Sequence, residues 1–292
     1  PYVEFQYMGS TIQSSHQKNI NDKTEWNEII NFAVPMPPVS RKIVCLVRDY
    51  DFGTGDDDIG SYEIDINDII GNENKYANYK YIDVYGSSKN SDDKYSKLMN
   101  TNAEISSSWN GRILLKIECK KTDTPIKNVV PIQDANELQI TRGLSRKECW
   151  NLKAKVYFAD FLPNDDKYSL KILFQENFAL FEQKKPINKS IQWKNVKDVQ
   201  LLTMTTNPED LPDVFFYLLN KSDEPICFQR IKAKSFYLND KIMIIKLFPN
   251  PCYGNKDNIN SGLLKVKINL YNLNEKNHVD LEKFKDGDSD VD

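Results

Sequence analysis

Alternation of apolar and polar residues with a period of two constrains the fold of this chain more than any other pattern. It is clearest in residues 263–271, which read LLKVKINLY, and in residues 112–120, which read RILLKIECK. Successive side chains of a β-strand point to opposite faces, so each segment is predicted to be a strand that buries one face. In the first segment the apolar face comprises Leu264, Val266, Ile268 and Leu270, and the polar face comprises Lys265, Lys267 and Asn269.

Further strand candidates are rich in β-branched and aromatic residues and are bounded by Asn, Asp, Gly, Ser and Pro. Long stretches with a period of 3.6 residues are scarce. Many short strands between turn signals predict an all-β fold, with antiparallel β-sandwiches joined by Greek-key connections. The segments are 2–8, 42–49, 151–159, 168–174, 213–220 and 241–248.

The length of 292 residues suits two domains in tandem, each with its own core. We expect the first domain at 1–120, a polar linker able to pack on one domain at 121–147, and the second domain at 148–274. Residues 275–292 end in an acidic run and are expected to be disordered. The two halves repeat the order of their features with little identity, which suggests two copies of one fold.

Composition excludes several function classes. A net charge of −3 without a basic block argues against nucleic-acid binding. The five cysteines lack CxxC spacing, which favours reduced thiols over disulfides or a zinc site. His16 and His278 are the two histidines, and no G-x-S-x-G elbow or phosphate loop is present, so we expect no enzyme activity. We also expect neither a membrane span nor a secretory signal.

Residues 47–61 read VRDYDFGTGDDDIGS and hold five aspartates. Asp49 and Asp51 are two residues apart at the end of a predicted strand, and Asp57 follows a loop that can fold back, so their carboxylates can converge on Ca²⁺. Without a cation, each pair at 4 Å would repel by about 1 kcal/mol in water. The alternative is a solvated acidic hairpin loop. Asp56 and Asp58 are expected to face solvent.

An EF-hand does not fit this loop. If Asp49 took position 1, Thr54 would stand where glycine is required and Gly60 where a bidentate glutamate is required. No helices are predicted on either side. The loop is therefore not expected to be an EF-hand.

The segments PYVEF at the start, TEWNE at 24–28 and the acidic loop together resemble a C2 domain. Asp49, Asp51 and Asp57 match the three acidic positions of that family, and Ile59-Gly60 matches the I-G that leaves the loop. The second half is similar to ferlin C2 domains in particular. Segments that carry this similarity are 109–125, 129–132, 151–174, 211–220 and 261–270.

The resemblance implies a calcium site in the first domain only, made by Asp49, Asp51 and Asp57. It is expected to be weak, because the upstream loop that supplies the other ligands in this family precedes Pro1. The anionic phospholipid surface is the implied partner, with Tyr50, Phe52, Gly53 and Thr54 as membrane contacts. Phe52 has an alternative role as a cap on the core.

Basic residues near the loop have two interpretations. Arg48, Arg41 and Lys42 either meet lipid phosphates or form the solvated face of a strand. Trp26 and Trp193 are expected to pack in cores or turns.

In the second domain, Asn220 and Ser222 replace the paired aspartates of the family, while Asp223, Asp165 and Asp166 are retained. Too few carboxylates would converge there for a metal. We therefore expect a calcium-independent second domain used for packing or partner binding.

The resemblance implies a calcium-responsive phospholipid-binding module of a ferlin-like protein in membrane fusion and vesicle exocytosis. It would act at the cytoplasmic face of a membrane, with the anchor in another part of the full-length protein. The alternative is a calcium-independent C2 scaffold that binds fusion-machinery proteins or other domains of the same chain. A third interpretation is a regulatory piece of a lipid-active enzyme.

Overall fold

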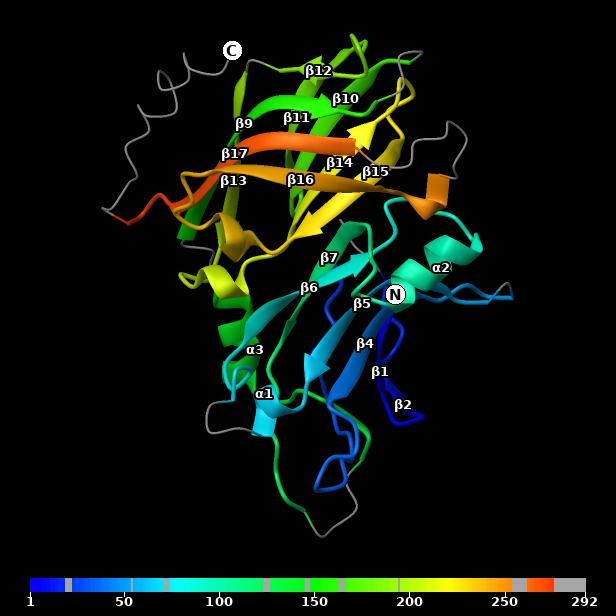
Figure 1. Ribbon diagram of the computed structural model, residues 1–292. Helices are drawn as coiled ribbons and strands as arrows, with labels where there is room; N and C mark the ends of the chain where they lie inside the picture. The colour runs from blue at the N-terminus through cyan, green and yellow to red at the C-terminus, as the bar shows by residue number, and fades with distance from the viewer. Residues whose placement is uncertain are drawn as a thin grey trace. The chain divides into compact units, whose positions relative to one another are not determined.

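Two units, Pro1–Leu144 and Ser145–Asp292, make up the computed structural model of the chain (Figure 1). Each is described by itself. The described residues are 1–18, 23–53, 55–70, 74–122, 127–144, 148–162, 166–193, 195–253 and 262–275. The predicted acidic tail therefore lies outside them except for Glu275.

The first unit is built on antiparallel strands in the order β2-β1-β4-β5-β6-β7. Ser61 and Tyr85 form the one paired position between β5 and β6. Val3, Cys45 and Ile82, from β1, β4 and β6, belong to one buried cluster. The strands are β1 Tyr2–Tyr7, β2 Ser10–Gln13, β4 Lys42–Asp49, β5 Asp57–Asp65, β6 Lys80–Gly86 and β7 Ser108–Leu115, and the short helices are α1 Asn67–Ile70 and α2 Lys94–Thr101.

The segment expected as a linker adds structure to the first unit. Its strand β8 (Val129–Pro131) pairs antiparallel with β3 (Glu28–Ile30), and helix α3 (Ala135–Gly143) follows. The Asp134 side chain accepts a hydrogen bond from the backbone N–H of Asn136 and caps the helix. The hydroxyl of Tyr79 donates to Glu137 at 2.8 Å, which ties α3 to the rest of the unit.

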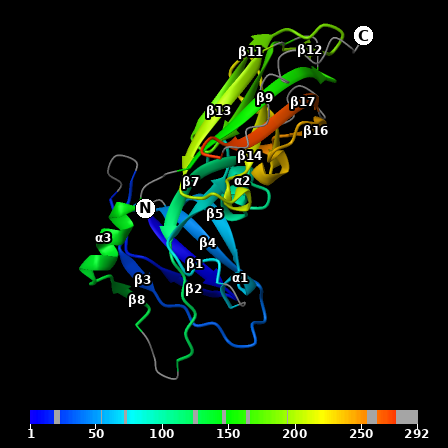
Figure 2. The same cartoon turned by 90° about the vertical axis from the view of Figure 1, so that its left-hand side faces the viewer.

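The second unit is a sandwich of two antiparallel layers. One layer has the order β11-β10-β14-β15, and the other has the order β16-β17-β9, with β12 and β13 both paired to β9 (Figure 2). The layers are joined where β15 meets β16 at two paired positions. The strands are β9 Glu148–Asp160, β10 Tyr168–Phe174, β11 Asn177–Lys184, β12 Ile191–Gln192, β13 Val196–Thr203, β14 Val214–Leu219, β15 Pro225–Ile231, β16 Ile242–Pro249 and β17 Gly262–Asn272; η1 Pro208–Asp210, η2 Ala233–Phe236 and η3 Pro251–Tyr253 are 3₁₀ turns.

The alternation of β17 explains how this sandwich forms. Its apolar face, which includes Leu264, Val266 and Ile268, is fully buried in a core shared with β9, β10 and β14. Lys265 and Lys267 point the other way and are partly exposed. Trp193 is buried and donates from its indole N–H to the Glu182 carbonyl. The predicted fold class, two antiparallel β-sandwiches in tandem, is confirmed.

Within the described ranges, no helix is long and apolar enough to cross a membrane.

Candidate functional site

The acidic loop is the turn between β4 and β5. Strand β4 ends at Asp49 and β5 begins at Asp57, and these two residues are directly opposite in the antiparallel ladder. Gly53 has a φ of +93°, a left-handed conformation that side chains with a Cβ rarely adopt. The hairpin thus brings Asp49 and Asp57 together at its neck, with Asp51 in the turn beyond them.

The I-G pair that leaves the loop has a steric explanation. A Cβ on Gly60 would lie 2.8 Å from the Tyr85 carbonyl oxygen and 2.8 Å from Val84 Cγ1. Only glycine lets β5 approach β6 this closely.

All three predicted ligands are exposed at this end of the unit. The pKa of Asp57 is raised, first because the negative charge of Asp92 lies near it and further because Asp51 does. Asp49 lies 3.4 Å from the amino group of Pro1. The loop therefore concentrates negative charge, as the sequence indicated.

Asp92 is a fourth acidic residue at this end that sequence reasoning missed. It lies just before α2, 35 residues beyond Asp57, and pairs with Lys97 at 3.6 Å. Nothing in the local sequence 88–94 links it to the loop at 47–61. A helix-capping pattern after Ser91 was the available signal, and it locates the turn without showing what the turn faces.

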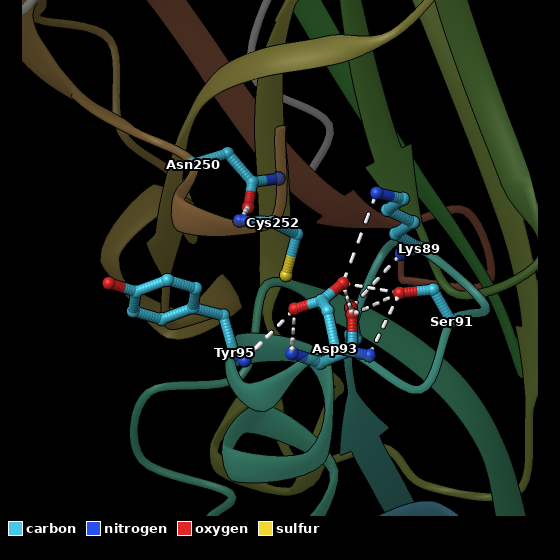
Figure 3. A network of polar contacts seen from close by, with 8 residues as sticks. Lys89, Ser91, Asp93, Tyr95, Asn250 and Cys252 are labelled. Carbon is cyan, nitrogen blue, oxygen red and sulfur yellow. Dashed lines mark hydrogen bonds and ion pairs between the residues drawn. The ribbon is translucent and has the colours of Figure 1, made fainter. Parts of the chain in front are cut away.

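The turn that carries Asp92 is fixed by its neighbour Asp93 (Figure 3). The Asp93 carboxylate accepts hydrogen bonds from the backbone N–H groups of Tyr95 at 2.9 Å and Ser96 at 3.0 Å, capping α2. It also accepts from the Ser91 hydroxyl. These donors, Ser91 first, lower the pKa of Asp93 to about 2. Asp93 is thus a structural cap, and its neighbour Asp92 is the residue that adds charge to the loop.

Arg48 holds the base of the loop. Its guanidinium lies 2.7 Å from Asp58 and 3.3 Å from Glu4, whose side chain is 7% exposed. The expectation that Asp58 faces solvent is therefore wrong, because strand pairing directs it onto the arginine. Asp56 is exposed as expected, yet it accepts a hydrogen bond from the Tyr2 hydroxyl at 2.6 Å. Arg48 is accordingly not a solvated strand residue.

The aromatic residues of the loop differ in their surroundings. The Tyr50 ring lies 4.3 Å from the His16 ring, which in turn lies 4.8 Å from the Tyr2 ring. Phe52 is 93% exposed, so it does not cap the core. Gly53 follows at the tip, and the predicted contact Thr54 lies outside the described residues.

The donor chemistry of this end fits Ca²⁺, a hard cation that prefers oxygen ligands. The raised pKa of Asp57 shows that the carboxylates repel one another, which a cation would relieve. Within the described part of the chain, however, no group of three or more His, Cys, Asp or Glu side chains is arranged to hold a metal. The residues suit calcium in kind, but their spacing does not make a closed site.

Comparison with protein families gives one match: the C2 domain model matches residues 1–81. The first unit carries a C2 domain. The matched range includes the acidic loop and β1, β4 and β5. Comparison with curated proteins gives no match.

Several solved C2 structures are similar to the chain. Domain A of the C2 pair in a plant extended synaptotagmin 1 is 15% identical, with 44% of this chain and 100% of that chain covered and a TM-score of 0.33. The two C2 domains, A and B, of extended synaptotagmin 2 are 13% identical, with 92% and 82% covered and a TM-score of 0.31. A longer extended synaptotagmin 2 structure that adds its SMP domain is 14% identical, with 92% and 53% covered and a TM-score of 0.32. Scores of this size support no argument about function.

The equivalent turn in the second unit lacks the convergence of carboxylates seen around the C2 loop. Asn220 accepts hydrogen bonds through its side-chain oxygen from the backbone N–H groups of Ser222 and Glu224. Its amide nitrogen donates to the Glu224 carboxylate at 2.8 Å. Asp166 accepts from the N–H of Lys167, and Asp165 lies outside the described residues. The turn is closed by its own side chains, in keeping with the expected calcium independence of this unit.

Replacing Arg48 with methionine should destabilise the C2 domain by roughly 2 kcal/mol. The buried Glu4 carboxylate would lose its ion pair, and loss of one partner of a buried pair costs about 3 kcal/mol or more, discounted because Arg48 is partly exposed. The measurement is the midpoint of urea unfolding. The control is Arg41→Met, which breaks an exposed pair with Asp65 and should cost about 0.5 kcal/mol. Equal shifts in both variants would contradict the assigned role of Arg48.

Asp92→Asn should lower the pKa of Asp57. A folded pKa above the unfolded value means that the protonated form is favoured by folding, so stability is lost as pH rises through the folded pKa. Removal of the Asp92 charge should reduce that loss. An NMR titration of the Asp57 carboxyl carbon measures the effect, with the exposed Asp240→Asn as a control. An unchanged Asp57 titration in Asp92→Asn would show that the two carboxylates are not neighbours.

Proposed function

We propose that the chain is a calcium-responsive phospholipid-binding module. The observation that carries this proposal is one loop end of a C2 domain where Asp57 has a pKa raised by Asp92 and Asp51, next to a Phe52 that is 93% exposed. Crowded carboxylates and an exposed aromatic tip are individually costly to a folded surface. Together they suit a loop that takes up a cation and then contacts a bilayer.

Bound Ca²⁺ would supply positive charge and open coordination positions for lipid headgroup oxygens. Asp49, Asp51 and Asp57 would hold it, with Asp92 as a further carboxylate at the same end. The field of the loop would then no longer repel anionic lipids. Phe52 would enter the interfacial layer, where aromatic rings are favoured. Arg48, paired to Asp58 and Glu4, keeps the neck of the hairpin fixed during this change.

A ferlin-like role in vesicle trafficking and membrane fusion is the finer part of the proposal. It rests on the sequence similarity of the second half to ferlin C2 domains. The module would act without enzyme activity at the cytoplasmic face of a membrane, with the anchor in another part of the protein. Binding to other domains of the chain or to fusion-machinery proteins would accompany membrane contact.

A calcium-independent scaffold is the second candidate function. Two observations favour it: the described carboxylates do not form a closed metal group, and Asn220 closes the equivalent turn of the second unit. A scaffold would use both sandwiches for protein contacts and would be indifferent to chelators. The thermal experiment below separates the two functions.

Calcium should raise the thermal stability of the chain relative to EDTA. A ligand that binds only the folded state at 100 times its Kd stabilises by about 2.7 kcal/mol. The double variant Asp49→Asn with Asp51→Asn should lose this stabilisation. The matched control, Asp166→Asn with Asp223→Asn in the second unit, should retain it. A calcium response that is absent from the unaltered chain would favour the scaffold.

Phe52→Ala should weaken calcium-dependent binding to phosphatidylserine vesicles by about tenfold while leaving the calcium-induced thermal shift unchanged. Burying a phenylalanine side chain contributes about 1.5 to 3 kcal/mol, and Phe52 has no packing role in the free protein to lose. Vesicle sedimentation measures the partition. The control is Phe178→Ala, an exposed phenylalanine of β11 in the second unit. Equal losses in both variants would argue against a special role for the loop tip.

A further inference from the structure

The outward face of the β16-β17-β9-β13 layer carries a cluster of lysines. The inward residues of these strands fill the core of the second unit, so the alternating residues point outward. Asp160 and Asp198 are the acidic residues at the outward positions of these four strands, and no arginine shares the face. Five lysines oppose those two aspartates: Lys153 and Lys155 of β9, Lys265 and Lys267 of β17, and Lys246 of β16.

The register places like charges beside one another. Lys155 and Lys267 are directly opposite in the antiparallel pair of β9 and β17, and Lys153 is the diagonal neighbour of Lys267. Like charges in directly opposed positions destabilise a sheet. Fold stability alone therefore does not account for this arrangement, and a negative surface over the whole face would relieve it.

Aromatic rings support the lysine ammonium groups. A register shift between β9 and β17 makes Tyr157 the extra residue beside Phe158, which is opposite Lys265. Lys265 Nζ lies 5.5 Å from the Phe158 ring centroid and 5.7 Å from that of Tyr157. Lys155 Nζ lies 5.0 Å from the Tyr157 centroid. The rings cover the apolar stems and leave the charges at the surface.

Strand β16 adds exposed apolar residues to the same face. Ile242 is 43% exposed, Ile244 is 61% exposed and Phe248 is 47% exposed, and they alternate with inward core residues such as Ile245. Lys246 lies between them, with its Nζ 5.1 Å from the Phe248 ring centroid. Apolar side chains next to a lysine cluster make the face amphipathic as well as basic.

We infer that this face is a second, calcium-independent contact for an anionic lipid bilayer. Lysines act as point charges, whereas recognition of one defined phosphate or carboxylate geometry usually employs arginine, which is absent from these outward positions. A flat sheet with dispersed lysines and apolar side chains fits an extended negative surface that also accepts apolar groups. The contact goes beyond the proposed function because it needs no metal and lies in the second unit.

The test is vesicle co-sedimentation of the whole chain in EDTA. Vesicles of phosphatidylcholine with phosphatidylserine should bind the chain, and vesicles of phosphatidylcholine alone should not. Lys155→Gln with Lys267→Gln should weaken binding about 30-fold, since each lysine near an anionic surface contributes about fivefold. The control pair Lys221→Gln with Lys232→Gln removes the same charge from exposed positions outside this face and should change binding little.

Two further measurements distinguish this contact from the calcium loop and from a purely structural role of the lysines. Asp49→Asn with Asp51→Asn should leave binding in EDTA unchanged, so the calcium loop can fail without affecting this result. The thermal stability of Lys155→Gln with Lys267→Gln should be equal or higher, because a like-charge pair is removed. Equal weakening by the control pair, no binding to anionic vesicles in EDTA, or binding to polyglutamate without binding to vesicles would each overturn the assignment.

Discussion

The ion pairs of Arg48 are the interactions on which the candidate site depends. One guanidinium from β4 joins Glu4 of β1 to Asp58 of β5, so three neighbouring strands meet at one cation directly below the acidic turn. Each carboxylate would be costly to bury alone, and each is neutralised by the same group. The turn above can therefore accumulate negative charge because the charge below it is already balanced. Removing that balance would place the strain of the loop on the strands that carry it.

The fold was largely predictable from local patterns. Period-two alternation in 263–271 identifies β17 and the face that it buries, because side-chain direction in a strand depends only on position along the chain. The strands at 42–49 and 168–174 follow for the same reason. The pairing of β3 with β8 was not predictable, because three-residue strands of mixed composition have no periodic signal.

The candidate site was predictable only within one hairpin. Spacing was enough to bring Asp49 and Asp57 together, since both lie at the ends of paired strands. Asp92 arrives from the loop before α2, and its proximity to Asp57 depends on tertiary packing that residues 88–94 do not encode. The fate of Asp58 was missed for a related reason: a bulge between Val47 and Arg48 changes which side chains meet across the ladder.

The β3-β8 pair also determines where the first unit ends as a physical object. Glu28, Ile29 and Ile30 obtain their ladder partners from Val129 to Pro131, and Tyr79 obtains its carboxylate partner from Glu137. A piece cut at residue 120 would thus leave an early strand and a half-buried tyrosine without partners that come from residues after the last strand of the main sheet. The smallest part of this chain that can satisfy its own backbone extends through α3, so the connecting segment belongs to the first unit both in contacts and in hydrogen bonding.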